Sequence, residues 1–221
     1  MVLDFVYLAS GSPRRRELLH QIGVSYRLVG SAIDEAVRPD EAPVVYVARL
    51  AAAKADAGWA NADAAWANTD AWANTDAARA TNREPADAPV LAADTAVVLD
   101  GKILGKPADR QDAAGMLRQL SGRTHEVLTA IALRTAGGVE SRISRSEVTF
   151  RRIAADEAGD YWETGEPGDK AGAYAIQGRA AVFIADLRGS YSGVMGLPLF
   201  ETAELLDRAG VLRWQAGGGT R

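Results

Sequence analysis

The sequence contains no cysteine and only two histidines, His20 and His125. The first absence excludes disulfides, thiolate nucleophiles and thiolate metal ligands, and the second excludes a metal site built from several imidazoles. No apolar run reaches the roughly 20 residues needed to cross a bilayer. The beginning of the chain, with Asp4 and an early Ser-Gly-Ser-Pro, lacks the pattern of a signal peptide. We therefore expect a cytoplasmic protein with no membrane partner.

Positive charge is also in short supply, because 25 Lys and Arg residues face 29 Asp and Glu residues, for a net charge of −4. General nucleic-acid binding needs a basic surface, so we expect no nucleic-acid partner. The pattern G-x-x-x-x-G-K-[ST] is missing, which argues against a P-loop kinase. With 221 residues, 48% of them hydrophobic, the chain can still build a sizeable core in one domain or two joined lobes.

What the chain does have is a dense group of small and basic residues near its start. Val2 to Leu8 has the composition of a strand, and Ser12 before a proline is a typical helix N-cap. Arg14, Arg15 and Arg16 then occupy the first turn of the helix, where the helix dipole favours negative charge. One arginine there would be an ordinary surface charge, but three beside a Ser-Gly-Ser loop favour an anion site, with phosphate as the anion.

A second dense stretch is the apolar run from Val90 to Leu99, which ends in Asp-Gly before another apolar triplet and so predicts a β-hairpin. Inside this run stands Asp94. A carboxylate is costly to bury without a partner, so Asp94 should face a cleft or a cation, with a raised pKa suited to a general base. The alternative is an exposed carboxylate on an edge strand, but the small neighbouring residues favour a site.

A third stretch, Asp169 to Gly178, surrounds Lys170 and Gln177 with small residues. A glutamine amide on a strand can read the edge of a nucleobase, or it can simply make a structural hydrogen bond. We expect Ala180 to Asp186 to be a strand and Ser190 to Pro198 a loop.

Hydrophobic periodicity predicts the remaining elements. His125 is expected on the polar side of a sheet, because no serine or cysteine elbow accompanies it. A single helical lysine such as Lys54 is by itself an ordinary surface charge. The expected helices cover Pro43 to about Ala57, 109–120, Ala154 to Thr164 and Leu199 to Ala209, and the expected strands cover Val24 to Val29, Glu126 to Leu133 and Val139 to Phe150.

Between residues 58 and 82 the sequence Ala-Trp-Ala-Asn-Thr-Asp occurs at 65–70 and again at 71–76, after a degenerate copy at 58–63. This period is too short for a solenoid. We interpret the stretch as an insertion tolerated at the surface, either extending the preceding helix or forming a loop. The alternative is an interaction surface built on its tryptophans.

Six motifs, in order along nearly the whole chain, resemble those of the Maf family of nucleoside triphosphate pyrophosphatases, also called septum formation inhibitors. They are S-G-S-P-R-R, A-A-D-T, G-K-P, S-G-R-T-H, D-K-A-G-A-Y-A-I-Q-G and G-S-Y-S-G-V-M-G-L-P. The resemblance implies an α/β fold similar to that of inosine triphosphatase. It would have an elongated, curved mixed sheet flanked by helices, with a cleft between two lobes. It also implies one Maf-like domain over residues 1–221 and, as is common in the family, a homodimer.

The resemblance further implies hydrolysis of a nucleoside triphosphate to the monophosphate and pyrophosphate, assisted by Mg²⁺ or Mn²⁺. The D-T and I-Q-G pieces look like the branch that acts on dTTP and UTP, with modified pyrimidine nucleotides left open. Asp94 matches the proton acceptor, Glu35 and Asp94 are the expected metal ligands, and Arg14, Thr95 and Gln177 match specificity positions. The expected phosphate-binding residues are Ser12, Arg14, Arg15, Lys54, Lys106 and Lys170.

Two rival functions stay open at this point. One is a nucleotide-sensing regulator of cell division that acts through protein contacts, for which the tryptophan repeat would be the natural surface. The other is a phosphatase that removes the terminal phosphate. Whether Asp94 is a base, a metal ligand or both is also open.

Overall fold

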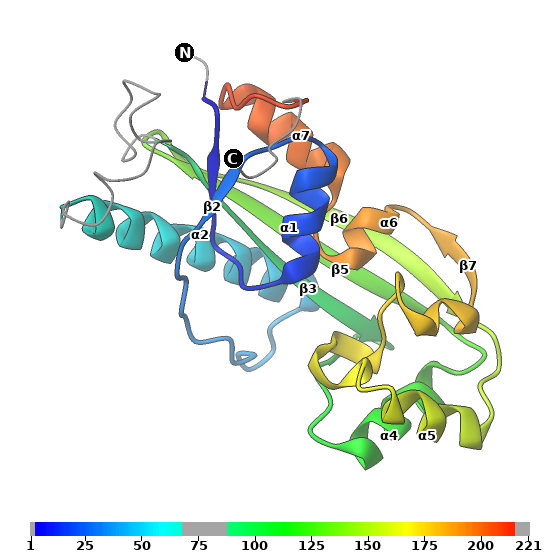
Figure 1. The fold of residues 1–221 in the computed structure, drawn as a ribbon. Helices are drawn as coiled ribbons and strands as arrows, with labels where there is room; N and C mark the ends of the chain where they lie inside the picture. The colour runs from blue at the N-terminus through cyan, green and yellow to red at the C-terminus, as the bar shows by residue number, and fades with distance from the viewer. Residues whose placement is uncertain (1–2, 68–87, 215–221) are drawn as a thin grey trace.

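The computed structural model describes residues 3–67 and 88–214, which form a mixed sheet with helices on both faces (Figure 1). The strands are β1 (Val6–Leu8), β2 (Tyr26–Leu28), β3 (Val90–Leu99), β4 (Lys102–Leu104), β5 (Thr124–Thr135), β6 (Gly138–Phe150) and β7 (Ile184–Arg188). The α-helices are α1 (Pro13–Gln21), α2 (Pro43–Ala67), α4 (Arg110–Leu120), α5 (Ala155–Glu163), α6 (Tyr191–Met195) and α7 (Leu199–Arg208). Short 3₁₀ helices are η2 (Pro167–Asp169), η3 (Ala171–Ala173) and η4 (Arg179–Phe183).

The strand order is β2-β1-β3-β5-β6-β7, and β4 pairs with the same edge of β3 as β1 does, farther along the strand. β1 runs parallel to β2 and β3, whereas the other pairings are antiparallel. On that edge the pairing with β1 extends only to Leu91, and the pairing with β4 covers Val97 to Leu99. Of the described strands, none pairs with β3 in the gap between Leu91 and Val97. The sheet edge is therefore open at Asp94 and Thr95.

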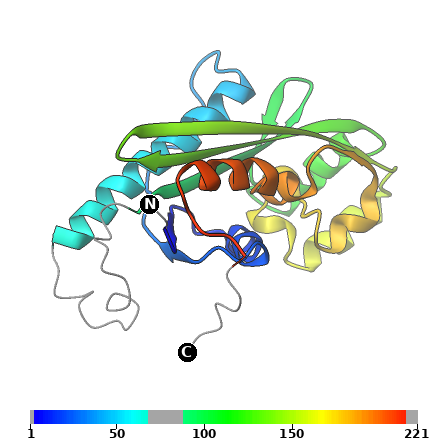
Figure 2. The same cartoon turned by 90° about the horizontal axis from the view of Figure 1, so that it is seen from above.

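The two faces of the sheet carry different cores. On one face, Val47, Ala51 and Ala55 of α2 pack on small residues of β3 and β5. The other face carries two separate cores, one under α1 and α7 and the other under α4 and α5. Figures 1 and 2 show these two pairs of helices toward opposite ends of the long strands. The expected mixed α/β fold, with helices flanking one sheet, is confirmed, and these two cores form its two lobes.

Helix α2 is longer than expected, because it continues past Ala57 to Ala67. Gly58 lies where this helix crosses the sheet: a Cβ on it would be 2.9 Å from both Ala9 Cβ and Val90 Cγ1. Asn61 donates from Nδ2 to the carbonyl of Gly30 at 2.8 Å. The first part of the predicted insertion is therefore an integral part of α2, whereas its remainder lies outside the described residues, as does the tail after Trp214.

Several expected elements need correction. The first strand begins at Val6, not Val2, because Leu3 pairs with Val211 near the other end of the chain. Residues Ala180 to Phe183 belong to η4, not a strand, since Ala180 and Phe183 both turn into the core under α4 and α5. The expected loop at 190–198 contains the short helix α6, capped by Ser190 Oγ, which accepts from the Gly193 amide at 2.9 Å.

The prediction for His125 was wrong. Its side chain is 3% exposed and packs edge-on against Phe150, and its Nε2 lies 2.8 Å from the Tyr174 hydroxyl. Burial lowers the pKa of His125 to about 4, so the ring is neutral at pH 7. The hydroxyl and the aromatic neighbours make this buried position tolerable for an imidazole.

The remaining predictions agree more closely with the structure. The Asp-Gly hairpin joins β3 to β4, and Asp109 caps α4 by accepting from the Asp112 amide at 2.9 Å. Ser12 precedes α1 as expected but makes no side-chain capping bond.

Candidate active site

A cavity of about 640 Å³ lies at the open edge of β3, between the two lobes. The loop before α1 lines one side, and η3 with the turn after it lines the other. All of the predicted site residues line this one cavity: Ser12, Arg14, Arg15, Glu35, Lys54, Asp94, Thr95, Lys106, Lys170 and Gln177. Their shared location is observed, while their individual roles stay predictions.

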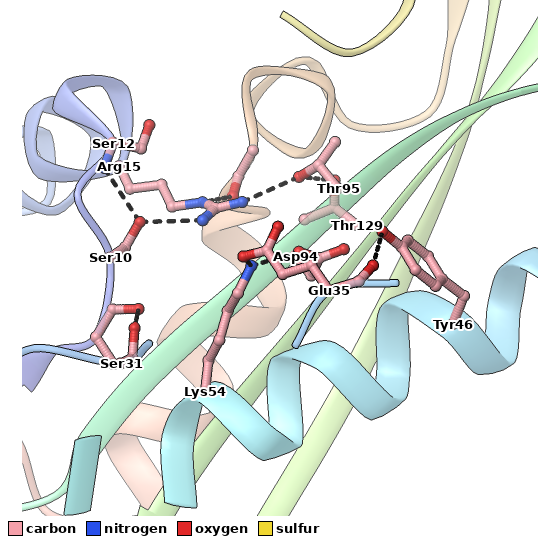
Figure 3. Close-up of polar contacts among 12 residues, drawn as sticks. Ser10, Ser12, Arg15, Ser31, Glu35, Tyr46, Lys54, Asp94, Thr95 and Thr129 are labelled. Carbon is pink, nitrogen blue, oxygen red and sulfur yellow. Dashed lines mark hydrogen bonds and ion pairs between the residues drawn. The ribbon is translucent and has the colours of Figure 1, made fainter. Parts of the chain in front are cut away.

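Asp94 and Thr95 are neighbours in sequence but point to opposite faces of the sheet, as the two-residue period of a strand requires. Asp94 faces α2, where its Oδ1 accepts from Lys54 Nζ at 2.8 Å. Thr95 faces α1, where its Oγ1 accepts from Arg15 Nη2 at 3.3 Å. Figure 3 shows Asp94 turned toward Lys54 and Thr95 turned toward Arg15. Because the edge of β3 is open here, one cavity reaches both side chains.

The Asp94 carboxyl group is buried beside two cations. Burial raises its pKa, while Lys54, through charge and a hydrogen bond, and Arg15, through charge, act in the opposite direction. Lys54 Nζ also lies 2.8 Å from Glu35 Oε1, so one ammonium bridges two carboxylates. The carbonyl of Glu35 is held by the Tyr46 hydroxyl at 3.1 Å. Lys54, which by residue pattern is an ordinary surface charge and which only the family resemblance placed in the site, is thus a central part of it.

The convergence of two carboxylates on one cation position also suits a divalent metal. Among the described residues there is no cluster of three or more histidine or acidic side chains that could hold one. Mg²⁺ is commonly bound by one or two carboxylates together with substrate phosphates. Glu35 and Asp94, both 2.8 Å from the Lys54 ammonium, fit that donor set.

Arg15 is held on three sides. Its Nε donates to the carbonyl of Gly196 at 2.8 Å and its Nη1 donates to Ser10 Oγ at 3.0 Å, in addition to the bond to Thr95. Burial lowers the pKa of Arg15 to about 10, with Asp94 opposing the shift, so the guanidinium is still charged at pH 7. Arg16, the third arginine of the run, is not among the cavity-lining residues.

The other cations differ in how they are engaged. Lys170 pairs with Asp169, its neighbour in the chain. Arg14 and Lys106 line the cavity without a hydrogen bond or ion pair to another described residue. Ser12 donates its backbone amide to Ser10 Oγ at 3.2 Å.

Gln177 lies in a turn between η3 and η4, not on the strand that the sequence suggested. It is exposed, and its amide makes no hydrogen bond to another described residue. Apart from Lys106, Asp169, Lys170 and Gln177, the cavity walls in this lobe are mainly apolar. They include Val97, Ile103, Leu104, Val127, Tyr174, Ile176, Val194 and Met195.

A family model described as "Maf-like protein" matches residues 5–209. The chain belongs to the Maf family. It is 50% identical over 204 residues to the dTTP/UTP pyrophosphatase of Alkalilimnicola ehrlichii, covering 91% of both chains. It is 51% identical over 214 residues to the dTTP/UTP pyrophosphatase of Cupriavidus metallidurans, covering 94% of this chain and 98% of that one.

A solved structure, that of the Staphylococcus aureus Ham1 protein, aligns with 68% of this chain and 72% of that chain, with a TM-score of 0.36 and 14% identity. A likeness this low carries no argument. Within the described ranges of this Maf protein, no helix is both long enough and apolar enough to span a membrane. The cytoplasmic location, the absence of a nucleic-acid partner and the homodimer stay predictions.

Sequence reasoning did not identify several residues that build this Maf site. Ser10 and Gly196 bind Arg15, Tyr46 holds Glu35, and Thr129 binds Thr95. Ser10 and Gly196 belong to the first and last of the six family motifs, but only the fold brings both to Arg15. The one usable signal for Thr129 was a hydroxyl in an otherwise apolar strand segment.

Proposed function

We propose that this protein hydrolyses dTTP and UTP to the nucleoside monophosphate and pyrophosphate. The observation that carries the proposal is a single cavity in which several cations face one buried carboxylate of raised pKa. Two relatives that are 50% and 51% identical in sequence to this chain are named dTTP/UTP pyrophosphatase, which supports the same reaction. Pyrimidine nucleotides with modified bases would enter the same cavity and belong to this substrate class.

Water attacks the α-phosphorus, and pyrophosphate leaves with the bonding electrons, so negative charge grows on the leaving oxygens. Arg14, Arg15 and the N-terminus of α1 hold the triphosphate from one lobe, and Lys106 and Lys170 hold it from the other. Positioning and charge stabilisation of this kind do most of the work in phosphoryl chemistry.

Asp94 accepts the proton of the attacking water. Its burial raises the pKa, which makes it a better base than an exposed aspartate, and Lys54 keeps it oriented at 2.8 Å. Mg²⁺ or Mn²⁺ bound by Glu35, Asp94 and the phosphates would neutralise charge on the triphosphate. Lys54 then has a second role, because its ammonium keeps the two carboxylates together before substrate binds.

Gln177 reads the base. Its amide offers one acceptor and one donor side by side, which match N3–H and O4 of uracil or thymine. Cytosine reverses this pattern, and each wrongly paired group costs about 1–3 kcal/mol. The apolar walls near Gln177 accommodate the faces of the ring.

The test is a panel of nucleoside triphosphates, with pyrophosphate and orthophosphate measured separately, with and without Mg²⁺. We expect pyrophosphate from dTTP and UTP, at least tenfold slower turnover of CTP, and dependence on the added metal. Release of orthophosphate from the terminal position would replace the proposed reaction by that of a phosphatase. Equal rates with CTP and UTP would remove Gln177 as the reader.

A further inference from the structure

Thr129 lies on β5 directly opposite Thr95 of β3, and it is 1% exposed. Its hydroxyl donates to the carbonyl of Gly193 at 2.7 Å. A hydroxyl has only one hydrogen, so the 3.0 Å contact between the two threonine hydroxyls must be donated by Thr95. Since Arg15 donates to Thr95 (Figure 3), the donor order runs from Arg15 through both threonines to Gly193.

This chain of hydrogen bonds has consequences for Thr95. Its single hydrogen is committed to Thr129, and one of its lone pairs is committed to Arg15. A side chain used in this way has no donor left for a base, whereas the amide of Gln177 is free of bonds to the rest of the described chain. Of the three expected specificity residues, Thr95 therefore has no free donor for a base, whereas Gln177 does.

The chain of hydrogen bonds also fixes the guanidinium of Arg15. Five N–H groups are available to an arginine, and three are used by Ser10, Thr95 and Gly196, which leaves two. Gly196 has a φ of +115°, and a Cβ on it would lie 3.4 Å from Arg15 Nε, so glycine permits this close carbonyl contact. One remaining N–H group is on Nη1 and the other on Nη2, and because Arg15 lines the cavity, both are available to phosphate oxygens.

We propose that Thr129 is a positioning residue for the polyphosphate. It does not line the cavity, and it acts by holding Thr95, which in turn orients Arg15 toward the phosphates. Thr95 consequently acts at the phosphate end of the substrate and leaves the base to Gln177. This inference deepens the proposed function and rests on it for the identity of the polyanion.

The test uses Thr129→Val, which keeps the shape of the side chain and removes its hydroxyl. Thr129→Ser keeps the hydroxyl and serves as the conservative rescue. Thr202→Val is the matched control, because Thr202 is 0% exposed and its hydroxyl has no hydrogen-bond partner among the described residues. Folding of all three variants is compared with wild type by thermal unfolding, and binding of inorganic pyrophosphate is measured by calorimetry.

We expect Thr129→Val to bind pyrophosphate about tenfold more weakly, because one hydrogen bond in a charged network is lost. Thr129→Ser and Thr202→Val should stay within twofold of wild type. The ratio of UTP to CTP turnover should be the same in Thr129→Val as in wild type. A variant that only loosens the fold would lower the melting temperature without this selective loss of anion binding.

Unchanged pyrophosphate binding in a folded Thr129→Val protein would overturn the inference, as would an altered UTP-to-CTP ratio, which would return Thr95 to the base. Failure of wild type to bind pyrophosphate would overturn it too. Pyrophosphate binding requires no hydrolysis, so the two binding outcomes are independent of whether dTTP and UTP are the true substrates.

Discussion

Charge is arranged residue by residue so that no ion in the cavity's centre is buried alone. Lys54 has a side chain only 12% exposed, yet it meets two carboxylates, and Arg15 spends three of its N–H groups on neutral oxygens. Buried charges without partners are strongly unfavourable, so these pairings are what permit the site to exist before substrate arrives. Asp94 differs from them, because burial raises its pKa by more than Lys54 and Arg15 lower it. Its charged form therefore destabilises the folded state.

That cost leads to a paired prediction for Asp94→Asn. Removing the base should lower turnover of UTP by about a hundredfold or more. The wild-type rate should also fall as the pH drops through the raised pKa of Asp94, and this acid limb should be absent from the residual rate of the variant. Initial rates between pH 4 and 8 check both points, and near-wild-type turnover in the variant would remove Asp94 from the mechanism.

Asp94→Asn should lower turnover but should not lower the stability of the fold. A carboxyl whose pKa is higher in the folded state than in the unfolded state destabilises the fold increasingly as the pH rises through that window, and the penalty persists at pH 7. Asparagine has no such charge, and Lys54 keeps Glu35 as its partner. We expect a melting temperature at pH 7 equal to or above that of wild type, and a clear drop would show that the Lys54 pair outweighs the cost of burial.

The site residues differ in whether the sequence alone could predict them. Asp94 and the arginines could be identified because a carboxylate in an apolar run and cations at a helix start both conflict with local preference. Thr129 and Gly196 could not, because their roles depend on strand register and on a contact between residues 181 positions apart. The burial of His125 could not be predicted, because Tyr174, whose hydroxyl bonds His125 Nε2, lies 49 residues away.

At the scale of elements, β3 combines a paired edge and an open one. Its pairing with β5 is unbroken through the site, while the gap between β1 and β4 on the other edge leaves room for substrate. Hydrophobic runs were enough to predict β3, β5, β6 and the hairpin. They could not separate η4 from a strand, because a short apolar run looks the same in either conformation.

Gly58 supplies a prediction about α2. Gly58→Ala adds a methyl group 2.9 Å from Ala9 and Val90, and overpacking of this kind costs about 1–3 kcal/mol, more than the roughly 1 kcal/mol gained in helix propensity. Gly115→Ala in α4 is the matched control, since its nearest neighbour would be the end of Arg118 at 3.8 Å. Chemical denaturation should show Gly58→Ala less stable, and Gly115→Ala more stable, than wild type.

The whole molecule places its cavity between two cores that share one sheet. The cations of α1 belong to one lobe, and Lys106, Lys170 and Gln177 belong to the other. Substrate held by both would connect the lobes. The tandem repeat at 65–76 lies almost wholly outside the described residues, so its interpretation as a tolerated insertion stays a prediction.

Two deletions distinguish the repeat from the helix it follows. Removal of residues 68–82 should leave UTP turnover within about twofold, because length changes in surface connections cost little. Removal of residues 60–80 should lower the melting temperature, since it takes away the buried Ala62 and the bond from Asn61 to Gly30. Loss of activity in a folded 68–82 deletion would instead assign the repeat a functional role.

The opposite orientations of Asp94 and Thr95 restrict how this chain can change its length during evolution. One additional residue between Leu91 and Asp94 would turn every following side chain of β3 to the opposite face of the sheet. Asp94 would then face Arg15 of α1 instead of Lys54 of α2. Substitutions in this strand can be compensated one at a time, but an odd-numbered insertion cannot. Length variation in natural homologues should therefore accumulate after α2 and be absent from the first half of β3.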